Sequence, residues 1–479
     1  TTASNNTAVG FDALTANTIG ASNVAVGKGA LDANTTASSS VAVGDGALGA
    51  NTVGSYSVAI GFSALAAQNP ASASASFNTA VGTEAGTAVT TGTQNTLIGG
   101  LAGDAITTAS NNTAVGYASL STNITGTANT AVGKDALLVN TASSNTAVGM
   151  DALTANTTGD TNTAVGKDSM KATTTGTNNS AFGARSLDTN TTGTNNVAVG
   201  DQALGANTSG NSNTAVGVGA LDANTTADNN VAVGLNSLGA NTTGTQNVAV
   251  GIQTLLTNTS GAQNTALGTN ALLANTSATG NTAVGAQALV ADTTGYGNTA
   301  VGSLSGDAIT TGINNTTVGR ASLTTCTTGG SNVAMGVSAL EGLTTGSNNV
   351  AIGANAGASI TTAAGNTAVG LESALNVTTG SGNTTYGFKA ARATTTGNGT
   401  AIGLESLYSN VSGIANVGLG DAAGYYITGS GNISIGSRNS SGAYVPAFDT
   451  AAQNNFISMG HTGVTNAYIK VAWSVTSDA

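Results

Sequence analysis

Few side chains in this sequence could do chemistry, and the most regular of them are carboxylates. An acidic residue recurs at one place of a 17-residue repeat, as at Asp12, Asp135, Asp151 and Asp168. Stacked carboxylates could hold a divalent cation or supply the paired acids of a glycoside hydrolase. Other copies interrupt this row with residues that cannot form such a pair, namely Gly29, Gly46, Ser63, Arg185 and Gln202. We therefore favour a solvated turn and predict no metal site.

His461 is the only histidine and Cys326 the only cysteine. A single histidine excludes an intrachain metal site built from several histidines and a repeated Ser-His-Asp arrangement. A single cysteine excludes an intrachain disulfide. Glu341, Glu372 and Glu405 are too isolated in sequence for us to propose the carboxylate pair of a glycan-cleaving enzyme. We predict that the chain is not an enzyme and uses no cofactor.

The charged residues argue against two classes of partner. The chain has 21 acidic and 10 basic residues, a net charge of −11, and its basic residues form no stripe that could follow phosphates. We therefore predict no nucleic-acid binding. No apolar run is long enough to cross a bilayer, so we predict no membrane span. Because the sequence opens at Thr1 inside a repeat, we expect an N-terminal attachment segment to precede it.

The elements that must position any site come from one repeated signature, first seen as Asn6-Thr7-Ala8-Val9-Gly10. It occurs 26 times, and 21 of the 25 steps between copies are 17 residues long. A fixed period of this size is typical of arrays in which each unit packs on its neighbours. Only 6% of residues are charged and 4% are aromatic, which suits such an array better than a globular enzyme. We predict an all-β fold, a fibrous parallel β-solenoid or β-roll with coils of about 17 residues.

We number the repeat from the first signature residue, so Asn6 and Asn213 are at position 1, and Gly10 and Gly217 at position 5. Glycine at position 5 of every copy predicts a positive φ or a close neighbouring backbone. Asparagine at position 1 has two explanations, and the sequence does not favour either of them. Its amide could hydrogen-bond to the copies above and below, or asparagine could simply favour the turn.

Positions 2 and 4 must share one face of a strand, with the alanine at position 3 on the other. We expect two core anchors in each coil: the valine of position 4, as at Val9 and Val216, and the leucine of position 9, as at Leu14 and Leu221. Val216→Asp would then bring a charge into a dry core. Because both strand faces are apolar, one could pack in the coil and the other against a partner chain. We favour a homotrimer, and a single-chain solenoid stays open.

Position 9 varies in a correlated way. In five copies its leucine becomes glycine and an aliphatic residue appears three residues later, as at Gly86 with Val89 and Gly424 with Ile427. The exchange predicts volume compensation at one core site. A spacing of three is helical or 3₁₀, so this corner could be a single helical turn.

The array has two irregular places. One step of 21 residues predicts an inserted surface loop at about 66–77 within a repeat array that covers 1–436. From Ser437 the period fails, and 437–479 forms an irregular, aromatic-rich C-terminal region. We favour a cap on the stack over a binding tip for its aromatic side chains and for two that precede it. These candidates are Tyr425, Tyr426, Tyr444, Phe448, Phe456, Tyr468 and Trp473.

Rows of threonine, asparagine and serine on the coil surface suggest two kinds of contact. They could order water, as ice-binding solenoids do, or meet the hydroxyl groups of a polysaccharide. We favour the polysaccharide because the threonine rows are mixed with other residues.

The Asn-Thr-Ala-Val-Gly arrays resemble the head repeats of trimeric autotransporter adhesins, which form left-handed parallel β-rolls. The end of the chain looks like a bacteriophage tail fibre at the start of an endosialidase-type intramolecular chaperone domain: Tyr468-Ile469-Lys470-Val471-Ala472-Trp473-Ser474-Val475-Thr476-Ser477-Asp478-Ala479. The resemblance implies a chaperone that helps a trimer to fold and then cuts itself off. By resemblance Ser477 is the candidate nucleophile and Ser477-Asp478 the bond that is cut, provided that the chaperone domain with its lysine follows.

Together these features predict a structural and adhesive fibre: a phage tail fibre on a virion that contacts a host surface polysaccharide. The alternative is a bacterial trimeric surface adhesin or an extracellular structural filament.

Overall fold

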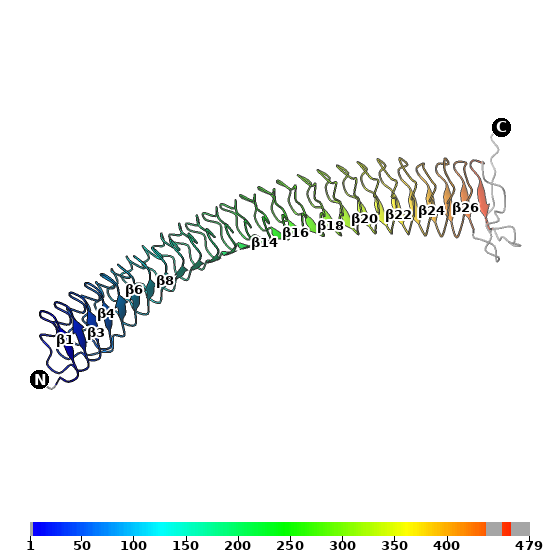
Figure 1. Ribbon diagram of the computed structural model, residues 1–479. Helices are drawn as coiled ribbons and strands as arrows, with labels where there is room; N and C mark the ends of the chain where they lie inside the picture. Colours follow the sequence, from blue (N-terminus) through cyan, green and yellow to red (C-terminus); the bar gives the residue numbers. More distant parts are fainter. Residues whose placement is uncertain (1–2, 437–452, 461–479) are drawn as a thin grey trace. The chain divides into compact units, whose positions relative to one another are not determined.

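The computed structural model describes residues 3–436 and 453–460. They fall into two compact units, Thr1–Asn264 (unit 1) and Thr265–Ala479 (unit 2), which are described separately. Every regular element among the described residues is a three-residue strand, and none is a helix. Figure 1 shows the coils of each unit stacked with their strands side by side.

The strands of unit 1 are β1 (Thr7–Val9), β2 (Val24–Val26), β3 (Val41–Val43), β4 (Val58–Ile60), β5 (Thr79–Val81), β6 (Thr96–Ile98), β7 (Thr113–Val115), β8 (Thr130–Val132), β9 (Thr146–Val148), β10 (Thr163–Val165), β11 (Ser180–Phe182), β12 (Val197–Val199), β13 (Thr214–Val216), β14 (Val231–Val233) and β15 (Val248–Val250). The strands of unit 2 are β16 (Thr265–Leu267), β17 (Thr282–Val284), β18 (Thr299–Val301), β19 (Thr316–Val318), β20 (Val333–Met335), β21 (Val350–Ile352), β22 (Thr367–Val369), β23 (Thr384–Tyr386), β24 (Thr400–Ile402), β25 (Val417–Leu419), β26 (Ile433–Ile435) and β27 (Ile457–Met459).

Within each unit consecutive strands pair in parallel, each residue with its equivalent one coil later. In unit 1, Ala215 of β13 pairs with Ala232 of β14. In unit 2, Ala283 of β17 pairs with Ala300 of β18. The predicted parallel β-solenoid with coils of about 17 residues is therefore confirmed.

Glycine at position 5 ends each strand for both predicted reasons. Gly217 has a φ of +135°, and a Cβ built on it would lie 2.5 Å from the carbonyl oxygen of Gly234 in the next coil. Only glycine takes this φ without strain and leaves room for the neighbouring backbone.

The assigned inward face of the strand was wrong. Ala215 at position 3 is fully buried, whereas Val216 at position 4 is 36% exposed. Leu97, at position 3 of β6, is fully buried where Gly86 and Gly103 replace the leucine of position 9. In the coils that keep that leucine, only a small space is left at position 3. The methyl group of alanine fits this space, so valine faces outward. Val216 is therefore not in a dry core of the single chain.

Leucine at position 9 is a core anchor, as predicted, since Leu221 is fully buried. The corner around it is a series of turns and not a helical turn. Leu221 has a φ of 53°, and residues at position 7, such as Asp168 with a φ of 57°, share this left-handed conformation. The spacing of three arises from a turn in which the Asn224 N–H donates to the Leu221 carbonyl. Residues with a left-handed backbone alternate along this corner, so the chain forms turns instead of the helical turn. The periodicity of the sequence does not reveal this alternation.

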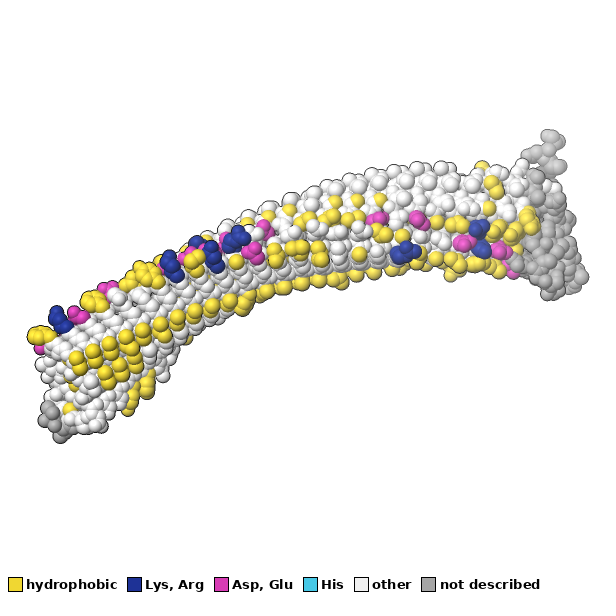
Figure 2. All heavy atoms as spheres, viewed as in Figure 1, with side chains coloured by type: hydrophobic (Ala, Val, Ile, Leu, Met, Phe, Trp, Pro, Cys, Tyr) yellow, Lys and Arg dark blue, Asp and Glu magenta, His cyan; other side chains and the backbone are white. Residues whose placement is uncertain are grey.

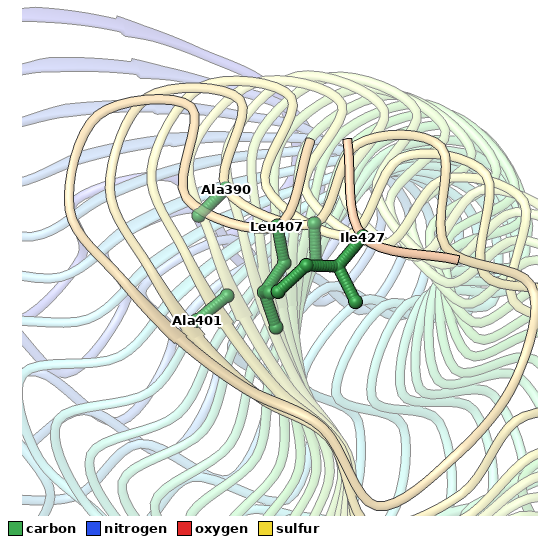
Figure 3. Packing of buried hydrophobic residues seen from close by; sticks show 5 residues of the cluster. Ala390, Ala401, Leu407 and Ile427 are labelled. Carbon is green, nitrogen blue, oxygen red and sulfur yellow. The ribbon is translucent and has the colours of Figure 1, made fainter. Parts of the chain in front are cut away.

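Volume compensation at this corner is confirmed. A Cβ built on Gly424 would lie 2.8 Å from Cδ1 of Ile427 and 2.7 Å from Cδ2 of Leu407 in the preceding coil. Figure 3 shows Leu407 and Ile427 filling the same interior from successive coils, beside Ala390 and Ala401. The isoleucine of position 12 thus occupies the space that a leucine of position 9 would take.

The asparagines of position 1 form the hydrogen-bonded ladder, which decides between the two explanations. Asn213 is fully buried. Its backbone N–H donates to Oδ1 of Asn196 at 3.0 Å, and its Nδ2 donates to the carbonyl of Ala227 at 2.8 Å, closing its own coil. Its Oδ1 accepts from the N–H of Asn230 at 3.0 Å. Each amide therefore joins neighbouring coils and satisfies buried backbone groups.

A second buried asparagine ladder lies at position 12, which the sequence did not reveal. Nδ2 of Asn207 donates to Oδ1 of Asn190, and Nδ2 of Asn224 donates to Oδ1 of Asn207, both at 2.9 Å. The repeated asparagine before threonine was the signal that could have indicated it.

The structure describes the inserted loop and part of the C-terminal end of the repeat array. Residues 71–75 are exposed, and Ser55 forms a parallel bridge with Ala75. Beyond the boundary expected at 436, strand β27 still pairs in parallel with β26, Ile435 with Met459. Parallel pairing therefore extends past the last 17-residue period, because a strand can join the sheet across a longer connection.

Candidate functional site

The outward strand residues at positions 2 and 4 form a regular surface in each unit, which we call the strand face. Its position-4 row includes exposed side chains such as Val199, Val216, Val301 and Ile352. Position 2 holds threonine, valine, serine or isoleucine. Figure 2 shows a band of hydrophobic side chains that follows the strands. This face can offer flat apolar contact but has no acid, base or nucleophile apart from hydroxyl groups.

Charged side chains are excluded from the strand face and gather at the corner that follows it. In the described part of the chain, charged residues are at positions 6, 7 or 10, with three exceptions, Asp160, Asp228 and Asp292. Figure 2 shows basic and acidic side chains in a separate band. The strand face is therefore uncharged, whereas the corner carries charged side chains in many coils and exposed apolar ones, such as Phe62 and Val218, in others.

In unit 1 the charged corner has ion pairs within a coil, Lys134 with Asp135 and Lys171 with Asp168, and one between neighbouring coils, Lys171 with Asp151. Nζ of Lys171 lies 2.9 Å from Asp168 and 3.7 Å from Asp151, and Lys134 lies 3.0 Å from Asp135. The hydrogen bond from Lys171 lowers the pKa of Asp168 below its usual value. These carboxylates, which the sequence suggested as metal ligands, lie in the solvated turn that we favoured and pair with lysines. Among the described residues no cluster of histidine, cysteine and acidic side chains could hold a metal ion.

In unit 2 the corner becomes aromatic near the C-terminal coils. The rings of Tyr408 and Tyr425 stack with centroids 4.8 Å apart, and Tyr426 meets Tyr425 edge-on at 4.7 Å. Arg392 donates from Nε to Glu372 at 2.7 Å and from Nη1 to the Tyr408 hydroxyl at 3.1 Å. The structure thus joins two predicted aromatic residues, Tyr425 and Tyr426, with a paired arginine and glutamate that the sequence did not connect.

The threonines of position 13 form a third outer row. The Thr208 hydroxyl donates to the carbonyl of Thr225 at 3.0 Å, and the Thr225 hydroxyl donates to the carbonyl of Thr242 at 3.2 Å. These hydroxyl groups join neighbouring coils, because each donates its hydrogen bond to a carbonyl of the next coil. The threonines of position 14, such as Thr158 and Thr243, are exposed and offer hydroxyl groups in most coils, with interruptions such as Ile19 and Val53.

Asp292 is a buried acid that sequence reasoning missed. It stands at position 12, in the place of a ladder asparagine, and is fully buried. Its Oδ1 accepts from the N–H of Gly295 at 2.8 Å, and its Oδ2 accepts from Nδ2 of Asn281 at 3.3 Å and of Asn298 at 3.4 Å. Burial raises the pKa of Asp292 to about 7. The sequence could have indicated this buried acid, because Asp292 replaces the asparagine that is common at position 12.

Cys326 also occupies position 12 and is buried. Burial raises the pKa of its thiol to about 11, which disfavours the reactive thiolate. Phe456 is half-buried beside β27. The other predicted candidates lie outside the described residues: Tyr444, Phe448, Tyr468, Trp473, Ser477 and Asp478.

No protein-family model matches this chain, and no curated protein matches it in sequence. In the described residues no helix has the length and apolar character needed to cross a membrane.

Proposed function

We propose that this chain is a structural and adhesive fibre: a homotrimeric bacteriophage tail fibre that contacts glycans on its host. The observation that carries the proposal is the repetition of equivalent outer side chains in most coils of a parallel solenoid. An exposed hydroxyl row of position 14, exemplified by Thr158 and Thr243, recurs with the coils. Such a surface suits many weak contacts along an extended ligand.

Multivalency supplies the mechanism. One hydroxyl group gains little by replacing water, because a typical hydrogen bond contributes only about 0.5–1.5 kcal/mol. Many equivalent sites on one rigid array bind further units of the same polysaccharide at high effective concentration. Three chains multiply this effect. The aromatic corner around Tyr426, which is 58% exposed, adds a flat surface for a sugar ring.

Binding is tested with the intact fibre and a panel of capsular polysaccharides and host cells. We expect retention on one or a few polysaccharides, with short oligosaccharides of the same type competing poorly. Equal competition per sugar unit by monomers and polymers would contradict multivalent binding. New reducing ends would instead indicate a glycan-cleaving enzyme.

The phage origin rests on the resemblance of the terminal motif around Ser477. Sequencing the gene past codon 479 and measuring the intact mass of the fibre tests it. A lysine-bearing chaperone region in the gene that is missing from the mass supports a phage fibre cut at Ser477-Asp478. A downstream membrane-anchoring barrel would reassign the chain to a bacterial adhesin, and a stop codon would reassign it to an extracellular filament.

A further inference from the structure

We propose that the strand face is the surface through which copies of this chain associate, parallel and in register. The occupant of this face is a second copy of the chain. The inference rests on the proposed homotrimeric fibre and specifies which of its surfaces forms the contact, leaving the corners outward.

The composition of the strand face supports self-association. Positions 2 and 4 carry no charge in any of the strands β1–β27, and position 4 is apolar or aromatic throughout. A chain of net charge −11 repels its copies wherever its acids meet. Two copies that meet at the strand face bring no carboxylates together, whereas contact at the corner would juxtapose acids such as Asp188, Asp201 and Asp222.

The upper limit of the strand-face area is comparable with that of a standard protein interface. Fully burying a valine contributes about 1.5–3 kcal/mol at about 25 cal/mol per Å², which corresponds to roughly 60–120 Å². Val216, at 36% exposure, would offer roughly a third of that area. Many outward residues of β1–β15 are less exposed than Val216, as in β10 and β14, so two residues per strand give at most roughly 600–1,200 Å² in unit 1, against about 800 Å² per partner in a standard interface.

The side-chain sizes of one coil, that of β11, fit contact at equal heights. Position 4 of β11 is Phe182, which is 44% exposed, and the same strand has Ser180 at position 2. On the next strand, β12, both places are valines, Val197 and Val199. In this coil a large residue coincides with a small one, although other strands, such as β26 with Ile433 and Ile435, have two large residues. The pairing at β11 would conserve the volume of a layer that is built from the same coil of each copy.

The coils whose length differs from 17 residues also favour association in register. The step from Ile60 to Val81 is 21 residues, and the step from Val132 to Val148 is 16. Copies that associate in register meet these irregularities at one height. Staggered or antiparallel copies would oppose an irregular coil with a regular one.

The first test is Val216→Asp in the full chain, with sedimentation velocity and far-ultraviolet circular dichroism as readouts. Because Val216 is outward in a single chain, we expect the β spectrum to persist while the oligomer dissociates at least tenfold more readily. Asp201→Ala on the exposed corner is the control and should leave the oligomer intact. An oligomer of Val216→Asp as stable as that of the parent would overturn the proposal.

The second test does not depend on the folding of a charged variant. In a Cys326→Asn background, which restores the common residue of position 12, Val216→Cys should form interchain disulfides with itself on mild oxidation. Asp201→Cys in the same background should not. Efficient cross-linking of Asp201→Cys, or none of Val216→Cys, would overturn the assignment of the face or its register.

These outcomes separate the inference from the proposed function. A trimer that cross-links at the corner keeps the fibre and its glycan binding but refutes the strand face. A monomeric parent chain refutes both the homotrimer and this interface. If that monomer also loses polysaccharide binding through Val216→Asp, the strand face is a ligand surface instead.

Discussion

Ala215 and Val216 are neighbours on one strand, yet the first is fully buried and the second is 36% exposed. The same contrast separates the buried amides of positions 1 and 12 from the hydroxyl and charged rows outside. Hydrophobicity alone does not choose the inward side in this solenoid, because most coils have room only for a methyl group beside the leucine of position 9. The larger Leu97 is buried at position 3 beside Gly86 and Gly103, which leave that space open. Size and hydrogen-bonding capacity decide instead.

The largest expected effect tests this contrast directly. Ala215→Asp buries an unpaired carboxylate and should destabilise its coil by several kcal/mol, whereas Val216→Asp should cost about 0.5 kcal/mol or less within a single chain. Urea unfolding at a concentration where the chains are dissociated measures both. Equal losses for the two variants would break the distinction between the inner and outer rows.

A second prediction concerns Asp292 in the buried row of position 12. Its pKa of about 7 in the folded chain exceeds the value of 3.8 expected after unfolding. The folded state therefore holds the proton more tightly, so stability falls as pH rises from about 4 to about 7 and stays low above that range.

Asp292→Asn restores the common ladder residue and removes this titration. At pH 8 it should raise the free energy of unfolding by up to roughly 4 kcal/mol, from about 1.36 kcal/mol per pKa unit. The gain should shrink toward pH 4. Asp201→Asn is the control, because the Asp201 side chain is 44% exposed. A gain that does not vary with pH would contradict burial as its cause.

Gly217→Ala sharpens the contrast at the end of the strand. The new Cβ would meet the backbone of Gly234 at an unfavourable φ of +135°, so we expect a loss of roughly 3 kcal/mol. Gly29→Ala is the matched control, since Gly29 has a φ of +62° and open space around its Cβ. It should cost about 1 kcal/mol. Thermal unfolding compares the two, and similar losses would show that the stacked backbone is not the constraint.

The smallest effect belongs to the charged corner. Lys171→Met removes ion pairs to Asp168 and Asp151 on a lysine side chain that is 51% exposed. We expect a loss of about 0.5 kcal/mol or less at low salt, which disappears at about 1 M NaCl through screening. Urea unfolding at the two salt concentrations measures it. A larger loss of unfolding free energy that persists in high salt would show that the corner contributes to stability as the buried rows do.

The sequence alone determined the repeated coil and the places where it must bend. Glycine after Val216 predicted a strand end, because no other residue satisfies both the φ and the close backbone. The exchange of leucine for Gly424 predicted that Ile427 fills its space, because a core site conserves volume.

The tertiary structure alone decided which strand side faces inward, because the alternation of side chains in a strand is symmetric. The cross-section that breaks this symmetry is set by residues such as Leu407, which lie on a different part of the coil. The same holds for the corner, where a spacing of three fits a helix or a chain of turns. The candidate site was least accessible to sequence reasoning. The ladder of Asn207 and the contacts of Arg392 with Tyr408 exist because stacking brings together residues one coil apart.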